Sequence, residues 1–334
     1  LTHANLSKQV QQIAAWVPIL KRGEEIMLGA LPYFHVFGLS ISMNFAVHMG
    51  WSQVLVPRPQ PQQLLEAIGK FRPTFAPLVP TMYIGMLNHA DLKKTDMSCI
   101  KGAFSGSAPL PIEVIHDFEK MTGAIIIEGF GLTETTPATH VNPFGGVRKV
   151  GSIGVPISDT MARIVSLEDG ITDMPVGERG ELILSGPQIM KGYKDMPEET
   201  ANTLRDGWCY TGDIATMDED GYFYIVDRKK DMIISGGFNV YPRDIDEVFY
   251  QHPKVQEACS IGIPDPKRGE KVKVFVVLRE GETATQEEFI EYCKTKLAIY
   301  KLPTEIEFRK ELPKTNVGKI LRKQLKAEET EKRK

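Results

Sequence analysis

Hydrophobic residues in the first part of the chain alternate between short apolar runs and segments in which they recur every three or four positions. The runs predict buried strands, and the helical spacing predicts amphipathic helices. The predicted strands are 53–56, 74–78, 99–105 and 124–127, and the predicted helices are 8–20, 61–70, 80–89 and 111–121, with another helical segment ending near residue 49. This alternation predicts an α/β fold with a doubly wound sheet covered on both faces.

From Gly151 onward the pattern changes twice. Short strands separated by glycine-rich turns predict a small β-barrel or sandwich, and a mixed set of strands and helices then predicts an α+β unit. The strands are 162–165, 181–184, 222–226, 232–234, 255–263, 271–278 and 305–308, and the helices are 242–252, 285–297 and a terminal one. We therefore expect three parts: 1–145 in a large α/β domain, 146–229 in its β-barrel-like subdomain, and 230–334 in a C-terminal α+β domain.

The overall composition is that of an ordinary globular protein. The 334 residues are 42% hydrophobic and 25% charged, and the net charge of −3 argues against nucleic-acid binding driven by bulk electrostatics. Four widely spaced cysteines indicate neither disulfides nor a zinc site and fit the cytoplasm. No apolar run is long enough to predict a transmembrane segment, which leaves peripheral membrane contact open, and the oligomeric state is not predicted.

Two loops follow predicted strands at the edge where α/β sheets bind ligands, 105–110 and 128–134. In the second loop, Phe130 can stack on a flat ring and Thr133 can contact a phosphate. Glu134 offers the hard oxygen ligand that Mg²⁺ prefers. An ordinary turn at the end of a strand remains the alternative.

Gly212 and Asp213 predict a sharp turn that presents a carboxylate. The aromatic strand 222–226 then leads to Arg228, where a basic run must reach solvent. A carboxylate and a guanidinium at one edge suit a ligand with hydroxyl and phosphate groups. A solvated hairpin rim is the alternative.

Three further features are open to two interpretations each. Lys319 ends a glycine-containing turn before the last helix and is either a projected functional lysine or a surface lysine. His35 lies among apolar residues and is either a site residue or a core histidine. The Gly236–Gly237 pair supplies either a turn with positive φ or close backbone access for a ligand.

Taken together, the motifs resemble a known superfamily. In chain order they are SGSAPLP (105–111), GFGLTE (129–134), YTGD (210–213), VDRKKDMIISGGFNVYP (226–242) and PKTNVGK (313–319). Their order resembles the adenylate-forming superfamily of acyl-CoA synthetases, luciferases and peptide-synthetase adenylation domains. QIMKGY (188–193) and DGW (206–208) resemble its medium- to long-chain fatty acid–CoA ligases in particular.

The resemblance implies an acid–thiol ligase with a two-step reaction. A carboxylate attacks the α-phosphate of Mg·ATP to give acyl-AMP and pyrophosphate, and the CoA thiol then displaces AMP. The implied acid is a fatty acid or another aliphatic carboxylate, and the implied cofactors are ATP, Mg²⁺ and CoA. The implied fold is an incomplete, doubly wound mixed sheet with a β-barrel subdomain and a mobile C-terminal domain.

The resemblance also assigns roles to individual residues. Phe130 stacks on the purine, Asp213 takes the ribose hydroxyls, and Lys319 bridges the acyl carboxylate and the phosphate. The residues implied in nucleotide binding are Gly106, Ser107, Ala108, Glu128, Gly129, Phe130, Gly131, Asp213, Ile225, Arg228 and Lys319. Those implied in catalysis are Lys319, Thr133, Glu134 and His35, with Glu134 as the Mg²⁺ ligand.

Family members are thought to rotate the C-terminal domain between the two steps, about a pivot that matches Lys230. Rotation would withdraw Lys319 and bring a CoA-facing surface to the thioester tunnel. The residues of that surface are Ser235, Gly236, Gly237 and Phe238.

Other functions remain open. The family carries a phosphate loop just before the position that matches Leu1, so we expect a fragment, and a nucleotide- or CoA-binding module without turnover is one alternative. An acyl-AMP ligase that serves a carrier protein is another, although residues 227–242 leave no room for its usual insertion. An amino-acid-activating domain is disfavoured because residues 34–46 contain no acid.

Overall fold

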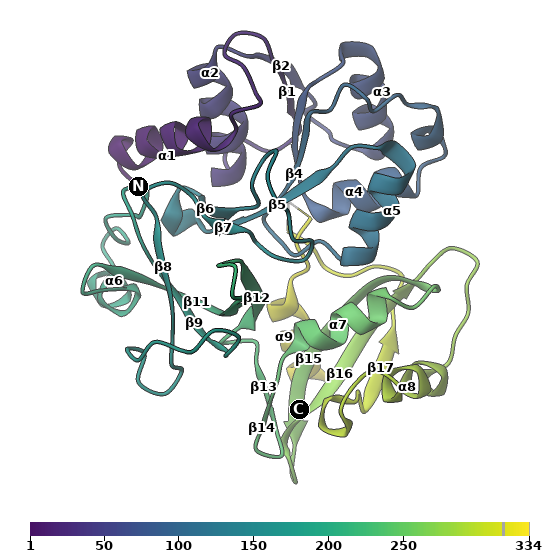
Figure 1. The fold of residues 1–334 in the computed structure, drawn as a ribbon. Coiled ribbons are helices and arrows are strands. Elements are labelled where there is room, and N and C mark those ends of the chain that lie inside the picture. Colours follow the sequence, from purple (N-terminus) through teal and green to yellow (C-terminus); the bar gives the residue numbers. More distant parts are fainter. Residues whose placement is uncertain (316–317, 334) are drawn as a thin grey trace. The chain divides into compact units, whose positions relative to one another are not determined.

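The structure is a computed structural model that describes residues 1–315 and 318–333. It divides into two compact units (Figure 1), each described by itself below. The first comprises Leu1–Thr211 and Ala215–Ile225, and the second comprises Gly212–Ile214 and Val226–Lys334. Asn316 and Val317 of the PKTNVGK motif lie outside the described residues.

The first unit is built on a seven-stranded mixed sheet in the order β2-β1-β3-β4-β5-β6-β7. Strands β1 to β5 are parallel, whereas β6 and β7 are antiparallel to their neighbours. The strands are β1 (Ile26–Gly29), β2 (Ser52–Leu55), β3 (Phe75–Leu78), β4 (Gly102–Ser105), β5 (Ile126–Gly131), β6 (Ala138–Val141) and β7 (Val155–Pro156). The predicted doubly wound mixed α/β fold is therefore confirmed.

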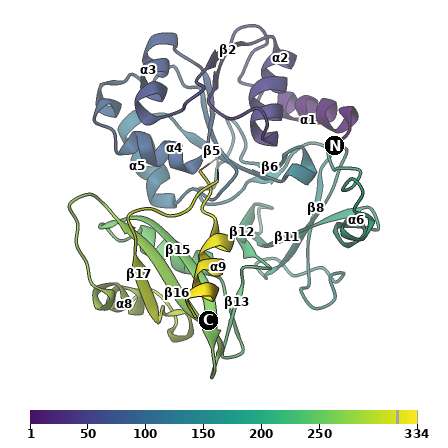
Figure 2. The ribbon, with the colours of Figure 1, turned by 180° about the vertical axis from the view of Figure 1, so that it is seen from behind.

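Successive strand residues face two separate cores, because side chains alternate between the faces of a sheet. Met27, Phe75, Phe104 and Ile127 pack with α1, η1 and α2, and their neighbours Leu28, Ala76, Ala103 and Ile126 pack with α3, α4 and α5. These helices lie on opposite sides of the sheet in Figures 1 and 2. Their bounds are α1 (His3–Trp16), η1 (Gly38–Asn44), α2 (Phe45–Met49), α3 (Pro61–Phe71), α4 (Pro80–Leu87) and α5 (Ile112–Thr122), with the 3₁₀ turn η2 (Ala90–Lys94) before β4.

A second, five-stranded sheet follows in the order β10-β11-β9-β8, with β12 paired to β11. The strands are β8 (Met161–Val165), β9 (Gly180–Ser185), β10 (Leu204–Arg205), β11 (Trp208–Met217) and β12 (Phe223–Arg228), and the short helix α6 (Pro197–Thr203) precedes β10. The turn predicted at Gly212 and Asp213 is wrong, because both residues lie inside β11. Gly212 has φ +69° within the strand, which fits a local kink better than a chain reversal.

The second unit has a sheet in the order β14-β13-β16-β15, with β17 parallel to β16. The elements are β13 (Ile233–Ser235), β14 (Phe238–Val240), α7 (Pro242–Tyr250), β15 (Val255–Asp265), β16 (Gly269–Leu278), α8 (Gln286–Lys294), η4 (Ile299–Lys301), β17 (Glu305–Phe308) and α9 (Arg322–Lys332). Helices α7 and α8 pack on one face of this sheet, and Leu325 of α9 packs on the other. Figure 1 shows α7 in front of the sheet, and Figure 2 shows α9 on the opposite face.

Strands β13 and β14 form a hairpin whose two linking residues are Gly236 and Gly237. Their φ angles are +59° and +83°, the left-handed values that a two-residue hairpin turn requires. The structure therefore explains this glycine pair by backbone geometry alone.

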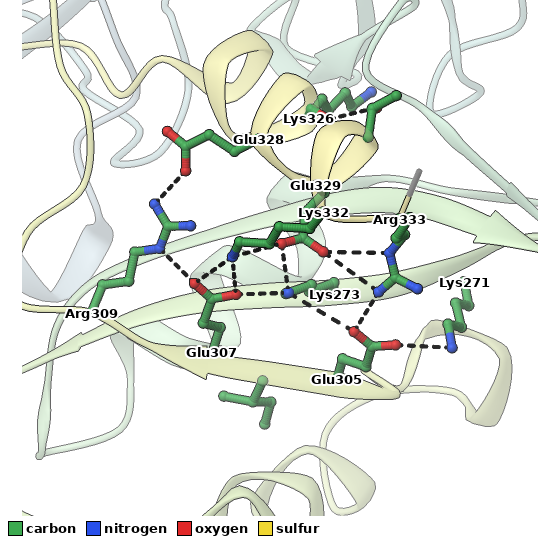
Figure 3. A network of polar contacts seen from close by, with 12 residues as sticks. Lys271, Lys273, Glu305, Glu307, Arg309, Lys326, Glu328, Glu329, Lys332 and Arg333 are labelled. Atoms are coloured by element: carbon green, nitrogen blue, oxygen red, sulfur yellow. Dashed lines mark hydrogen bonds and ion pairs between the residues drawn. The ribbon is translucent and has the colours of Figure 1, made fainter.

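Helix α9 is fixed to the sheet by a network of ion pairs (Figure 3). Lys273 of β16, whose side chain is 8% exposed, lies 2.8 Å from both a Glu307 oxygen and a Glu329 oxygen. Burial would raise the pKa of Glu307, but hydrogen bonds from Lys273, Lys332 and Arg309 lower it to about 2. Because Glu329 belongs to α9, Lys273 ties the helix to the sheet.

Replacing Lys273 with methionine is expected to destabilise the second unit by about 1–3 kcal/mol, because the change removes a buried cation and its bonds to two carboxylates, although Lys332 still pairs with both. Stability should also become less dependent on pH in acid. The lowered pKa of Glu307 means that its contribution is full above about pH 4.3 and is lost as the pH falls toward 2. Urea unfolding of both proteins at pH 7 and pH 3 measures this effect. An unchanged midpoint at pH 7 would contradict it.

Within the described residues, no helix is both long enough and apolar enough to cross a membrane.

Candidate functional site

The loops after β4 and β5 lie side by side in the first unit. Ser105 pairs with Glu128 in parallel register, so residues 106–108 and the end of β5 emerge at the same sheet edge. Ser107 has φ +73°. The Oγ atoms of Ser105 and Ser107 are buried and have no hydrogen-bond partner among the residues described. Buried hydroxyls without a partner call for an explanation, and a polar ligand at this edge would supply one.

Three glycines of the predicted nucleotide site have close protein neighbours. A Cβ on Gly106 would lie 3.3 Å from the Phe37 ring, and one on Gly129 would lie 2.5 Å from the Phe104 ring. A Cβ on Gly131 would overlap the carbonyl of Pro137. Packing of the chain on itself therefore explains why these positions carry glycine.

Phe130 is half-buried and lies against the buried His140, which in turn lies against the buried Phe223. The Phe130 ring lies edge-on to His140, with a centroid distance of 6.3 Å, and the His140 ring lies 4.7 Å from that of Phe223. Burial lowers the pKa of His140 to about 3, so this histidine is neutral at physiological pH. No role was predicted for His140, and in the structure its ring supports Phe130.

The loop that follows β5 carries Thr133 and Glu134 on the short 3₁₀ turn η3 (Thr133–Thr135). Thr133 is exposed and Glu134 is half-buried. The Tyr193 hydroxyl donates to Glu134 Oε1 at 2.6 Å, and the Met190 amide donates to the Glu134 carbonyl at 2.7 Å. Burial and then the adjacent Glu134 raise the pKa of Tyr193 to about 12, so the phenol remains a donor.

The remaining predicted residues of the first unit lie in different surroundings. Glu128 is buried and accepts a hydrogen bond from the Gly151 amide at 2.8 Å. His35 is half-buried just before the π-helix η1, and its Nδ1 accepts from the Phe37 amide at 3.2 Å. Ile225 is half-buried in β12. His35 is therefore not a fully buried core histidine.

In the second unit, Asp213, Arg228 and Lys319 form one group. Arg228 Nε lies 3.2 Å from Asp213 Oδ1, and Asp213 is 3% exposed. Burial raises the pKa of Asp213 to about 6 against the opposing charges of Arg228 and Lys319. Burial, followed by the charge of Arg228, lowers the pKa of Lys319 to about 8. A carboxylate and two cations from three segments are thus brought together.

The family follows from comparison with known proteins. Residues 1–194 match the family model described as AMP-binding enzyme, and residues 244–319 match the model of the AMP-binding enzyme C-terminal domain. The chain belongs to the AMP-binding enzyme family. The predicted resemblance to adenylate-forming enzymes is confirmed.

Curated relatives are similar along nearly the whole chain. A long-chain-fatty-acid–CoA ligase of Bacillus subtilis (strain 168) is 51% identical over 331 residues, which are 99% of this chain and 59% of that relative. A long-chain-fatty-acid–CoA ligase of Escherichia coli O6:H1 is 40% identical over 330 residues, 98% of this chain and 58% of that relative. The chain therefore spans less than two thirds of the length of these relatives.

A solved structure has the same fold as this chain. The crystal structure of ATP-bound MatB from Rhodopseudomonas palustris matches with a TM-score of 0.94 at 31% identity, and the match covers 100% of this chain and 65% of that one. This likeness agrees with the mixed sheet of the first unit and the smaller sheets that follow.

The donor set around Glu134 fits the Mg²⁺ site expected of an AMP-binding enzyme. Mg²⁺ in nucleotide enzymes is held through one or two carboxylates together with phosphate oxygens and waters. Glu134 supplies a half-buried carboxylate whose Oε1 is oriented by Tyr193. Within residues 1–315 and 318–333, no group of three or more histidine, cysteine or acidic side chains could hold a metal.

Two residues with strong site contacts were not predicted. Tyr193 reaches Glu134 across 59 residues, and Arg322 reaches Asp246 across 76. The QIMKGY motif contains Tyr193 and was a usable signal for it. No local pattern identifies Arg322, because its partners are distant in sequence.

Proposed function

We propose that the natural protein containing this chain is a fatty acid–CoA ligase that uses ATP. The main support is the group formed by Asp213, Arg228 and Lys319. The chain that contains this group is 51% identical to a protein named long-chain-fatty-acid–CoA ligase. That relative's name supports a long-chain acid as the substrate. Asp213 suits ribose hydroxyls, and the two cations suit phosphate and carboxylate oxygens.

The first proposed step forms acyl-AMP. A carboxylate oxygen of the fatty acid attacks the α-phosphorus of ATP, a new P–O bond forms, and the bond to the bridging oxygen breaks so that pyrophosphate leaves. Two anions must approach each other in this step. Lys319 carries a proton below about pH 8 and would neutralise their repulsion.

Residues of the first unit would contact the nucleotide in this step. Phe130, supported by His140, offers an aromatic face for the purine. Ser105 at the end of β4 and Ser107 in the following loop offer two buried hydroxyls. Glu134 would hold Mg²⁺, which supplies charge neutralisation on the phosphate oxygens when bound. Thr133 presents an exposed hydroxyl next to Glu134 and would contact phosphate.

The second proposed step forms the thioester. The sulfur of CoA attacks the carbonyl carbon of acyl-AMP, the carbon–oxygen bond to AMP breaks, and the thiol proton passes to solvent. The hairpin around Gly236 and Gly237 would face CoA, because two residues without side chains allow close approach of the pantetheine arm. The loop that contains His35 would border the acyl chain.

Release of pyrophosphate and formation of acyl-CoA test the proposal directly. The natural protein is incubated with ATP, Mg²⁺, CoA and acids of different lengths, with amino acids as the control substrates. We expect both products with fatty acids and neither with amino acids. Pyrophosphate without acyl-CoA would favour an acyl-AMP ligase that serves another acceptor, and no pyrophosphate with any acid would refute adenylation.

The adenylation rate should depend on pH in a bell-shaped manner. Asp213, with its pKa raised to about 6, must lose its proton to accept hydrogen bonds from ribose, and Lys319, with its pKa lowered to about 8, must keep its proton. We therefore expect kcat/KM for pyrophosphate exchange to fall below about pH 6 and above about pH 8. Lys319→Arg should move the alkaline limb upward by at least ~2 pH units. An unmoved alkaline limb would assign that limb to another group.

A further inference from the structure

Arg322 begins helix α9 and lies three positions after Lys319 in the chain. Its Nη2 donates to Asp246 Oδ2 at 2.6 Å, and its Nε donates to the Ser260 carbonyl at 3.0 Å. Its Nη1 also lies 3.9 Å from Asp227 Oδ1 and 3.8 Å from Asp231 Oδ2. One guanidinium is thus surrounded by three carboxylates.

The partners of Arg322 come from four different segments. Asp227 immediately precedes Arg228 at the end of β12, Asp231 follows Lys230, Asp246 belongs to α7, and Ser260 belongs to β15. Asp227 also accepts from the Arg243 amide at the start of α7 at 2.8 Å. Arg322 therefore joins the start of α9 to the strand end that carries Arg228.

This acidic cluster depends on the guanidinium for its charge balance. Burial raises the pKa of Asp246 to about 6 and also raises that of Asp227, and in both cases the charge of Arg322 opposes the rise. An arginine side chain stays protonated inside a protein and presents several donors in a fixed plane. A lysine carries the same charge but lacks this planar set of donors.

The turn that carries Lys319 is closed by its own bonds. The Thr315 amide donates to the Lys319 carbonyl at 2.8 Å, and the Leu321 amide donates to the Pro313 carbonyl at 2.8 Å. On one side the base of the turn is fixed by Lys314, whose Nζ lies 2.6 Å from Glu257 Oε1 on β15. On the other side it is fixed by Arg322, which binds the Ser260 carbonyl of the same strand.

We propose that Arg322 is a positioning residue that sets the place of the Lys319 ammonium group relative to Asp213 and Arg228. The inference rests on the proposed function, because it concerns the lysine assigned to acyl-AMP formation. Without the guanidinium of Arg322, the base of the turn loses one of the two polar side-chain attachments to β15 described above. Lys319 would then occupy its place for only part of the time, and a misplacement of about 1 Å can cost 10²-fold in rate.

The opposite end of α9 provides a matched control. Lys332 pairs with Glu307 and Glu329 at 3.1 Å each in the network of Figure 3 and belongs to the same helix as Arg322. Lys332→Met should weaken the docking of α9 without changing the base of the turn. If Arg322 only held α9 in place, substitutions at Arg322 and at Lys332 would change the rates of acyl-AMP formation and thioester formation in the same proportion.

The test compares Arg322→Met, Arg322→Lys and Lys332→Met in the natural protein. Acyl-AMP formation is measured by pyrophosphate exchange, and thioester formation is measured separately from supplied acyl-AMP and CoA. We expect Arg322→Met to slow the first reaction by about 10²-fold and the second by less than about threefold. Arg322→Lys should retain an intermediate rate of the first reaction, and Lys332→Met should leave the ratio of the two rates unchanged.

Equal losses in both reactions for Arg322→Met, or the same split for Lys332→Met, would overturn the inference. If Arg322→Met does not fold, the ratio of the acyl-AMP rate to the thioester rate is measured for Arg322→Lys instead. That variant keeps the positive charge inside the aspartate cluster, and an unchanged ratio would overturn the inference. Failure of the unsubstituted protein to exchange pyrophosphate would instead refute the proposed function.

Discussion

Replacing Lys319 with alanine is expected to slow acyl-AMP formation by about 10³-fold while thioester formation from supplied acyl-AMP stays within about threefold of the natural rate. The ammonium group of Lys319 is the one that meets the carboxylate and the α-phosphate in the proposed first step. Its lowered pKa of about 8 still leaves it charged at neutral pH. The second step begins from a neutral thiol and an acyl carbonyl and does not bring those two anions together.

Stopped-flow or quench measurements of the two half-reactions separate these effects. Lys323→Ala is the matched control, because Lys323 is an exposed lysine on the adjacent turn of α9 and should leave both rates unchanged. If Lys319→Ala slowed both half-reactions equally, the assignment of the lysine to one step would be wrong.

Replacing Lys230 with proline is expected to have the opposite effect, with thioester formation slowed by at least about 10²-fold and acyl-AMP formation largely kept. Lys230 is exposed between β12 and β13. The described backbone bonds of this turn use the amides of Lys229, Asp231 and Met232, so a proline at 230 removes none of them. Because proline fixes φ near −65°, it would oppose a rotation about this residue.

Lys230→Ala is the control for the hinge, since it removes the charge and keeps the rotational freedom. Both half-reactions are measured as for the lysine variants. A proline variant with an unchanged rate of thioester formation would show that the pivot lies elsewhere.

The sequence predicted the start of a helix well where a proline or a capping side chain stands in or before its first turn. Pro61 and Pro80 stand in the first turns of α3 and α4, and the Thr285 side chain caps α8 by accepting from the Glu288 amide, in agreement with the helix starts predicted at 61, 80 and 285. Strand β1 was missed because its apolar residues continue directly into the apolar segment that follows, so no polar residue marks the end of the strand. Gly212 was misjudged because a glycine beside an aspartate is typical of turns, whereas pairing with neighbouring strands keeps β11 extended.

The candidate site was predictable only in part, for a related reason. Motifs identify residues such as Glu134 and Lys319, but the side chains that orient them are brought close by folding. Tyr193 is fixed to Glu134 by one hydrogen bond, and Arg322 lies in a cluster of acids from three segments. Contacts between residues so distant in the sequence leave no periodic pattern from which to predict them.

The central claim is that the carboxylate attacks the α-phosphorus of ATP, and the fate of its oxygen tests this most directly. A fatty acid labelled with ¹⁸O in its carboxyl group is converted with ATP and CoA, and the phosphate-containing products are analysed by mass spectrometry. If acyl-AMP is the intermediate, one labelled oxygen must leave with AMP. Recovery of the label in inorganic phosphate, or none in AMP despite acyl-CoA formation, would contradict the account.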